Sequence, residues 1–178
     1  MFGWLRMKNW RSSPAHLLLL SKFRGGDSPA KYCNVEYWEV ALKEKSITVI
    51  NQFIKDGVLE LAGLQELMNY KFKASDLKVM LKERSLKFSG RKEELIQRLL
   101  ANNVQSMREA TKGLELYRCT KEGLQLAEHY LEEEKAKRNV MERDVLDLLA
   151  RTEFSKAVSI VAQFEASKVF PRGLSIDW

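Results

Sequence analysis

Two short amphipathic helix patterns, separated by a Ser-Gly turn, lie within residues 74–99 and constrain the fold more than any other part of this chain. Helices this short can bury an apolar stripe only against each other or against a neighbouring element. The apolar side chains recur at helical spacing on one face of each helix. The sequence therefore predicts a compact helix pair whose shared core contains Leu77, Leu81, Leu86, Leu95, Ile96 and Leu99, with Met80 and Leu100 beside it.

The expected start of the second helix places positive charges where a helix favours negative ones. Ser75 is the predicted N-cap of the first helix, and Ser89 or Gly90 that of the second. Arg91 and Lys92 then fall in the first turn of the second helix, where the free N–H groups favour anions and disfavour cations. A bound phosphate would compensate the two cations, which makes this helix start a candidate phosphate site.

The ordered combination of these residues resembles the SAP motif, a two-helix DNA-binding element, over about a fifth of the chain. One departure concerns Ser85, because the family usually places glycine there, before the linker leucine. Serine tolerates a left-handed helix end less well than glycine, so we expect a strained or differently wound loop. The residues that carry the resemblance are Leu77-Lys78, Leu81, Leu86, Ser89-Gly90, Lys92, Leu95-Ile96 and Arg98-Leu99.

The charge distribution supports a polyanionic partner independently of the resemblance. Residues 70–99 contain nine basic and four acidic side chains, in a chain whose formal net charge is +6. A single lysine on a helix is usually only solvated, but nearby carboxylates are too few to neutralise this cluster. The residues expected to contact the phosphate backbone are Lys78, Lys87, Ser89, Gly90, Arg91, Lys92 and Arg98.

Little in this cluster is suited to reading bases. Asn and Gln are scarce at its helix positions, so we expect DNA binding with little sequence specificity. If the protein does read sequence, the basic N-terminal segment around Arg6, Lys8 and Arg11 is the one expected to do so. An RNA-binding accessory factor is an alternative, because phosphate contacts alone do not distinguish the two polymers.

The whole chain is predicted to be an all-α, multi-helix protein that contains this helix-linker-helix module. We expect a basic, poorly ordered arm over residues 1–31, a helical segment packing on the module over 32–69, the module over 70–103 and a C-terminal helical region over 104–178. Helical spacing runs through residues 37–55 with an interruption near Ser46, and a short helix is expected over 59–68. The run from Ser46 to Ile50 is the best strand candidate, but no partner strand is evident, so we assign it to a helix.

The C-terminal region shows three further helix patterns. Thr120 is the predicted N-cap of a helix over residues 121–138, followed by helices over 140–150 and 154–166. The apolar tail, which includes Phe170, Leu174, Ile176 and Trp178, is expected to fold back on the helical body. A protein-interaction scaffold that uses these helices is therefore a second alternative function.

Several classes of protein are disfavoured. The chain has no Walker-type loop, no Gly-x-Ser-x-Gly and no HExxH, and its carboxylate pairs lie in charged helical stretches, so we expect neither catalytic residues nor an enzyme. Cys33 and Cys119 are expected to be free thiols in a reducing compartment, with no metal and no cofactor. The longest apolar run is Leu17 to Leu20, too short for a membrane span. We therefore expect an intracellular protein of the cytoplasm and nucleoid, or of the nucleus in a eukaryote.

Overall fold

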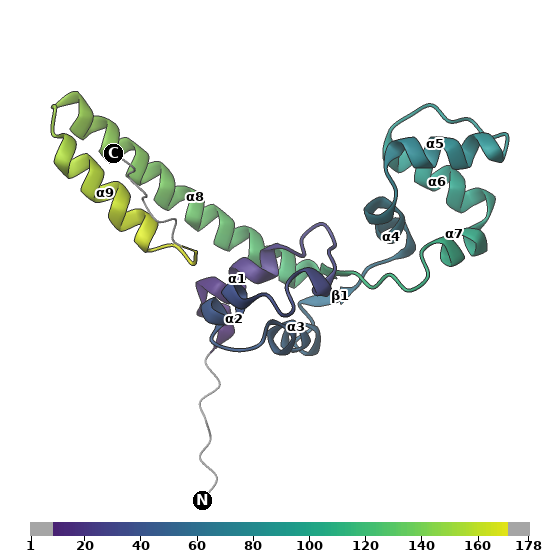
Figure 1. Cartoon of the computed structure of the whole chain (residues 1–178), viewed down its shortest axis with the longest axis horizontal. Coiled ribbons are helices and arrows are strands. Elements are labelled where there is room, and N and C mark those ends of the chain that lie inside the picture. The colour runs from purple at the N-terminus through teal and green to yellow at the C-terminus, as the bar shows by residue number, and fades with distance from the viewer. Residues whose placement is uncertain (1–8, 171–178) are drawn as a thin grey trace, which may run out of the picture.

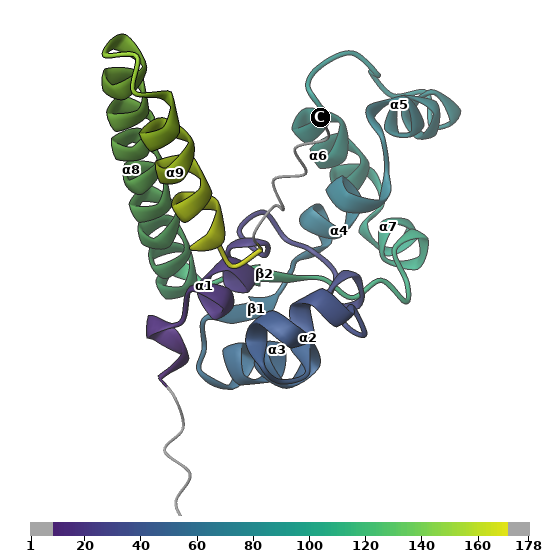
Figure 2. The ribbon, with the colours of Figure 1, turned by 60° about the vertical axis from the view of Figure 1, so that its left-hand side comes forward.

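The computed structural model describes residues 9–170, and within them the protein is predominantly helical, as predicted. Figure 1 shows a central body, a long helical hairpin made of α8 (Lys121–Ala150) and α9 (Phe154–Ala166), and a smaller helical unit on the other side of the body. The turned view in Figure 2 keeps the hairpin and the smaller unit apart. The central body therefore joins two separate helical projections.

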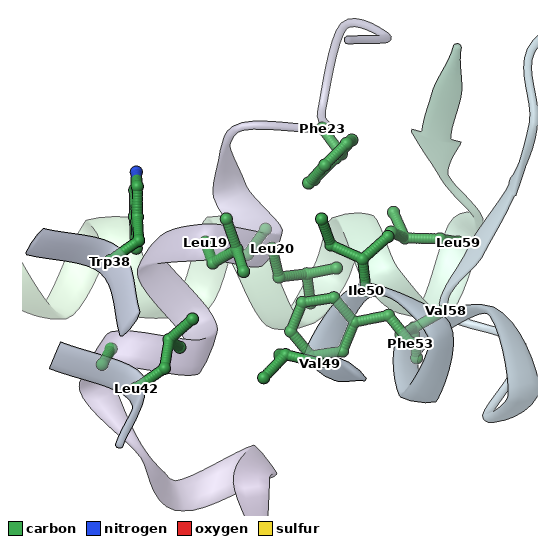
Figure 3. Packing of buried hydrophobic residues seen from close by; sticks show 12 residues of the cluster. Leu19, Leu20, Phe23, Trp38, Leu42, Val49, Ile50, Phe53, Val58 and Leu59 are labelled. Atoms are coloured by element: carbon green, nitrogen blue, oxygen red, sulfur yellow. The ribbon is translucent and has the colours of Figure 1, made fainter. Parts of the chain in front are cut away.

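The central body is built on three helices: α1 (Pro14–Ser21), α2 (Glu36–Leu42) and α3 (Ser46–Lys55). Figure 3 shows their apolar side chains, together with Val58 and Leu59, directed into one core. The helical assignment of residues 46–50 and the interruption before Ser46 are both confirmed, since Lys43 takes the left-handed conformation and ends α2. The fully buried members of this core include Leu19, Leu20, Phe23, Ile50 and Phe53.

The expected poorly ordered arm is wrong for residues 9–31. The apolar run in this segment forms α1, whose Leu19 and Leu20 are fully buried. The Nη2 atom of Arg11 lies 2.9 Å from Oε1 of Glu122 in α8, so this cation is already paired. Packing of α1 against α2, α3 and α8 buries Leu19 and Leu20 in the core and places Leu18 at its edge, which the basic composition of the segment did not indicate. Arg6 and Lys8 lie outside the described residues.

A two-stranded antiparallel sheet pairs segments that are far apart in the sequence. Strand β1 (Leu59–Leu61) pairs with β2 (Tyr117–Cys119), with Glu60 opposite Arg118. The other edge of β2 meets the segment after α1, where Asp27 and Tyr117 exchange two backbone hydrogen bonds of 2.9 and 3.0 Å. The expected helix over 59–68 is therefore wrong in its first half, because a partner 58 residues away leaves no local periodicity to detect.

The polypeptide between these two strands forms the smaller helical unit of Figure 1, here called the inserted unit (residues 62–116). It contains α4 (Leu64–Lys71), α5 (Ala74–Glu83), α6 (Lys92–Asn102) and α7 (Val104–Ala110). Its core is separate from that of the body and includes all six predicted residues, with Leu86 partly buried at the edge. Met68 of α4 and Met107 of α7 complete this core.

This arrangement corrects two predicted boundaries. Residues 32–61 pack in the central body, and only α4 from the predicted 32–69 segment packs on the helix pair, through Leu64 and Met68. Leu61, which falls within the segment expected to pack on the module, lies in β1 and is 63% exposed. Conversely, α7 belongs to the inserted unit, although residues from 104 onward were expected to form a C-terminal region.

Helix α8 starts from a tightly fitted junction with the body. Thr120 caps it as predicted, since its Oγ1 accepts a hydrogen bond from the Gly123 N–H at 3.3 Å. The Thr120 Oγ1 also donates to the Gly57 carbonyl at 2.8 Å, and its N–H donates to the Val58 carbonyl at 3.0 Å. A Cβ at Gly123 would lie only 2.0 Å from the Val58 carbonyl oxygen. Glycine is therefore required where α8 passes over the Val58 backbone.

The rest of the C-terminal region is simpler than the sequence suggested. Helix α8 runs unbroken for 30 residues, where two helices were expected, because no glycine or proline interrupts it near residue 139. Helix α9 has its predicted bounds. The chain then returns to the body, and Phe170 meets Trp38 edge-on at a ring-centroid distance of 4.8 Å. The tail residues from Leu174 onward lie outside the described residues.

We predict that Gly123→Ala destabilises the protein although alanine favours helix. Overpacking against a backbone oxygen costs about 1–3 kcal/mol, whereas the gain in helix propensity is at most about 1 kcal/mol. Urea denaturation followed by circular dichroism measures the net loss. Gly25→Ala is the matched control, because no atom lies within 4 Å of the added Cβ. Equal stability of Gly123→Ala and wild type would contradict this packing.

We also predict that Leu95→Ala lowers the free energy of unfolding of the inserted unit by about 2–5 kcal/mol, because Leu95 is fully buried in its core. Leu146→Ala, at a leucine that is 66% exposed on α8, should change stability by less than about 0.5 kcal/mol. Similar losses in the two variants would show that the core is packed differently. Urea denaturation monitored by circular dichroism provides the comparison.

Candidate nucleic-acid interface

The linker between α5 and α6 begins with a fully formed helix C-cap. The Ser85 N–H donates to the Lys82 carbonyl and the Leu86 N–H to the Leu81 carbonyl, both at 2.9 Å. These two bonds define a Schellman motif, in which the residue after the C-cap is left-handed. Ser85 occupies that position with φ of +55°. The expected strain at Ser85 is therefore present, and the linker leaves the helix along the path that a glycine would favour.

We predict that Ser85→Gly stabilises the protein by about 0.5–1 kcal/mol. Removing the left-handed strain of a non-glycine residue gains about 1–3 kcal/mol, and the added freedom of glycine in the unfolded chain offsets part of it. Ser75→Gly provides a control of opposite sign, since Ser75 lies inside α5 and glycine disfavours helix. Thermal and urea unfolding of both variants test the prediction. A lower stability for Ser85→Gly would contradict it.

Helix α5 begins earlier than the sequence predicted, and helix α6 begins later. The N-cap of α5 is Lys73 rather than Ser75, and the Lys73 N–H donates to the Asp76 carboxylate at 2.8 Å. The N-cap of α6 is Arg91, and Lys92 is its first residue, so neither Ser89 nor Gly90 caps it. The first turn of α6 also contains Glu93 and Glu94. These carboxylates complement the positive helix end, which weakens the argument that the two cations alone require a phosphate there.

The Arg98 side chain holds the linker in place through hydrogen bonds. Its guanidinium donates to the carbonyl groups of Lys87 and Ser89, at 3.1 and 2.5 Å, and also to the Glu94 carboxylate at 3.3 Å. Gly90 lies over this pair with φ of +127°, and a Cβ there would lie 2.2 Å from the Glu94 Oε2. Arg98 and Gly90 therefore shape the loop, and their predicted contact with the phosphate backbone stays a prediction.

Lys92 also has an internal partner. Its Nζ donates to the Asn69 carbonyl at 2.6 Å and so ties α6 to the end of α4. Lys71 and Arg84, two further members of the basic cluster, donate to the carbonyls of Ala110 and Met80. Part of the positive charge counted in the sequence thus serves to hold the inserted unit together.

The remaining cations of the cluster face solvent. Lys73, Lys78, Lys87 and Arg91 are exposed, and within residues 9–170 their side chains form no hydrogen bond or ion pair. Ser89 is exposed beside Arg91 at the tip of the linker. The structure thus leaves Lys78, Lys87, Ser89 and Arg91, among the predicted residues, available to an external ligand.

One cation–π pair in this region was not predicted from the sequence. The Lys82 Nζ lies 4.6 Å from the centre of the Phe88 ring, which is 45% exposed in the linker. An exposed aromatic ring with a lysine over it offers both an apolar face and a charge next to Ser89. The signal in the sequence was a large aromatic residue directly before the Ser-Gly turn, at a position that the helix pair does not need for its core.

The family model of the SAP domain matches residues 71–102, which span α5, the linker and α6. This segment is a SAP domain. The match begins at the last residue of α4 and ends at the last residue of α6, so α4 and α7 extend the domain within the inserted unit. No curated protein and no solved structure matches the chain. The SAP domain indicates that the protein binds nucleic acid.

Residues 9–170 contain no helix that is long and apolar enough to cross a membrane, and no cluster of three or more potential metal ligands. Cys33 and Cys119 are both free thiols, as predicted. Burial raises the pKa of the Cys119 thiol to about 12 and raises that of Cys33 as well. Neither thiol is therefore primed as a nucleophile at neutral pH.

Proposed function

We propose that the protein binds duplex DNA through the SAP domain, by contacts of the linker and adjoining helix surfaces with the phosphate backbone. The observation that carries this proposal is the group of solvent-facing cations on the linker and α5, within a domain that indicates nucleic-acid binding. Lys87, Ser89 and Arg91 lie within five residues on an exposed loop, and Lys78 extends the basic surface along α5. Charged and hydroxyl donors of this kind bind phosphate oxygens.

The basic residues of the linker and of α6 have two proposed roles, which are to hold the loop and to contact phosphates. Arg98 and Lys92 fix the loop and the helix start, so their contribution to binding is to hold the exposed donors in position. Lys87 and Arg91 supply solvent-exposed positive charge for the phosphate backbone. Because such contacts carry no base information, the SAP domain is proposed to bind with little sequence preference, at dissociation constants of about 10⁻⁴ to 10⁻⁶ M near physiological salt.

We propose duplex DNA rather than RNA, and binding without catalysis. A competition assay in which unlabelled duplex DNA or duplex RNA displaces a labelled DNA duplex tests the choice of polymer. Stronger displacement by RNA would favour the accessory-factor alternative. Loss of the labelled DNA duplex in the presence of Mg²⁺ would contradict the proposal that the protein binds without catalysis.

A protein partner is the second candidate, on the evidence of the hairpin. Large apolar side chains are exposed along α8 and α9, namely Val140, Leu146, Leu149, Phe154 and Val158. Such residues on a projecting hairpin suit a protein contact better than a phosphate backbone. A stable protein complex that persists at about 0.15 M salt, with no nucleic-acid binding under the same conditions, would favour this role over the first.

We predict that Lys87→Ala/Arg91→Ala weakens binding to every duplex tested and flattens its salt dependence. Each lost phosphate contact should reduce the slope of log affinity against log salt by about 1. Fluorescence anisotropy with a labelled duplex at several salt concentrations measures both quantities. Lys121→Ala/Lys135→Ala removes the same charge from exposed positions of α8 and controls for the net charge of the chain. If the two double variants lose affinity equally, the linker is not the site.

A further inference from the structure

The central body contains a helix-turn-helix that the SAP domain does not involve. Helix α2 ends at Leu42, three residues form the turn, and α3 begins at Ser46. The turn is sharp because Lys43 adopts the left-handed conformation with φ of +61°. The two helices contact each other and both contact α1. Leu42 and Trp38 of α2 and Val49 of α3 are buried in the shared core, as Figure 3 shows.

The neighbouring elements anchor this pair at both ends. After α1 the chain forms a bridge with β2 at Asp27, and after α3 it forms β1 on the other edge of the same strand. Gly57 and Val58 follow α3 directly and are held by the Thr120 hydroxyl and N–H. Three packed helices closed by a small antiparallel sheet present the second helix of the turn on a stable support. Helices so placed in helix-turn-helix proteins enter the major groove of DNA.

The outward face of α3 has the chemistry that base recognition requires. Val49, Ile50 and Phe53 are buried, and the opposite face exposes Thr48, Asn51 and Lys55 together with Ile47. An asparagine side chain can pair with adenine through two hydrogen bonds, and threonine offers a hydroxyl and a methyl group to base edges. No internal hydrogen bond occupies the side chains of Thr48 or Asn51 within the described part of the chain.

The charges around α3 favour a polyanion. Lys43 and Lys45 in the turn and Lys55 at the end of the helix are exposed, and within residues 9–170 none forms an ion pair. The two nearby carboxylates have partners of their own. Glu44 lies 3.4 Å from the His16 ring. Asp56 accepts hydrogen bonds from the Trp10 indole at 2.7 Å and from the Gln52 amide at 2.6 Å.

We propose that α3 is a second DNA-binding element, which enters the major groove and reads bases through Thr48 and Asn51 while Lys43, Lys45 and Lys55 contact phosphates. The inference rests on duplex DNA being the ligand of the SAP domain and adds to that function a source of sequence specificity. It places base reading on α3, whereas the sequence pointed to the N-terminal segment. The inserted unit then supplies affinity for any duplex, and α3 supplies preference among duplexes.

The test is a selection from a random duplex library with the full chain, followed by measurement of the specificity ratio, the dissociation constant for random duplex divided by that for the selected sequence. Wild type should enrich a short sequence motif. Asn51→Ala/Lys55→Ala should lower the ratio about tenfold, because one two-bond base contact discriminates by about 1–3 kcal/mol. Asn139→Ala/Lys135→Ala removes the same pair of residues, at the same spacing, from an exposed face of α8 and should leave the ratio unchanged.

A second variant guards against misfolding. Asn51→Asp keeps the size of the side chain at an exposed site and places a negative charge where the groove would lie, so it should abolish the preference while the melting temperature is retained. Lys87→Ala/Arg91→Ala should weaken binding to selected and random duplexes equally.

If wild type binds duplex DNA but enriches no motif, or if the motif survives the Asn51 variants, the inference is wrong and the SAP proposal stands. If wild type binds no duplex DNA, both are wrong.

Discussion

The three-residue pairing of β1 with β2 is the contact on which the rest of the architecture depends. It brings Leu59 opposite Cys119 and so closes an excursion of more than fifty residues at a single narrow point. The residues that flank the strands make the backbone contacts that start α8, since Val58 before β1 accepts from Thr120 after β2 and Gly123 passes directly over Val58. The pairing thus sets where the inserted unit joins the body and where α8 begins, and the packing of α8 on α1 supports the helix beyond that point.

Two hydrophobic cores lie on either side of this junction. The inserted unit buries its own leucines and methionines, and the body buries the aromatic and aliphatic side chains of α1, α2 and α3. Few contacts cross between them beyond the strands. Arg118 of β2 donates to Glu66 of α4 at 2.5 Å and to Glu60 at 2.9 Å, and the Lys31 Nζ lies 4.7 Å from the Tyr70 ring. Such partly exposed pairs orient the unit without adding much stability.

Separation of the cores has a functional consequence for the proposed binding surfaces. The linker of the SAP domain and the outer face of α3 lie on different units, so substitutions on one surface need not disturb the packing of the other. Affinity and specificity can then be measured separately in one protein. The hairpin α8–α9 stands apart from both surfaces and leaves its exposed apolar side chains for a different kind of contact (Figure 2).

The sequence by itself determined the helical class, the helix pair with its six core residues, the strained Ser85, the cap at Thr120 and the bounds of α9. All of these follow from periodicity and local capping, which act within a few residues of each other. The sequence also located the basic cluster, but it did not show which of these cations face solvent and which hold the fold together. Charge can be counted along a chain, whereas the carbonyls that engage Arg98 and Lys92 become neighbours only in the folded linker. Tertiary structure alone decided the pairing of β1 with β2, the burial of α1 and the support beneath α3, because each joins segments whose separation in sequence erases any local pattern.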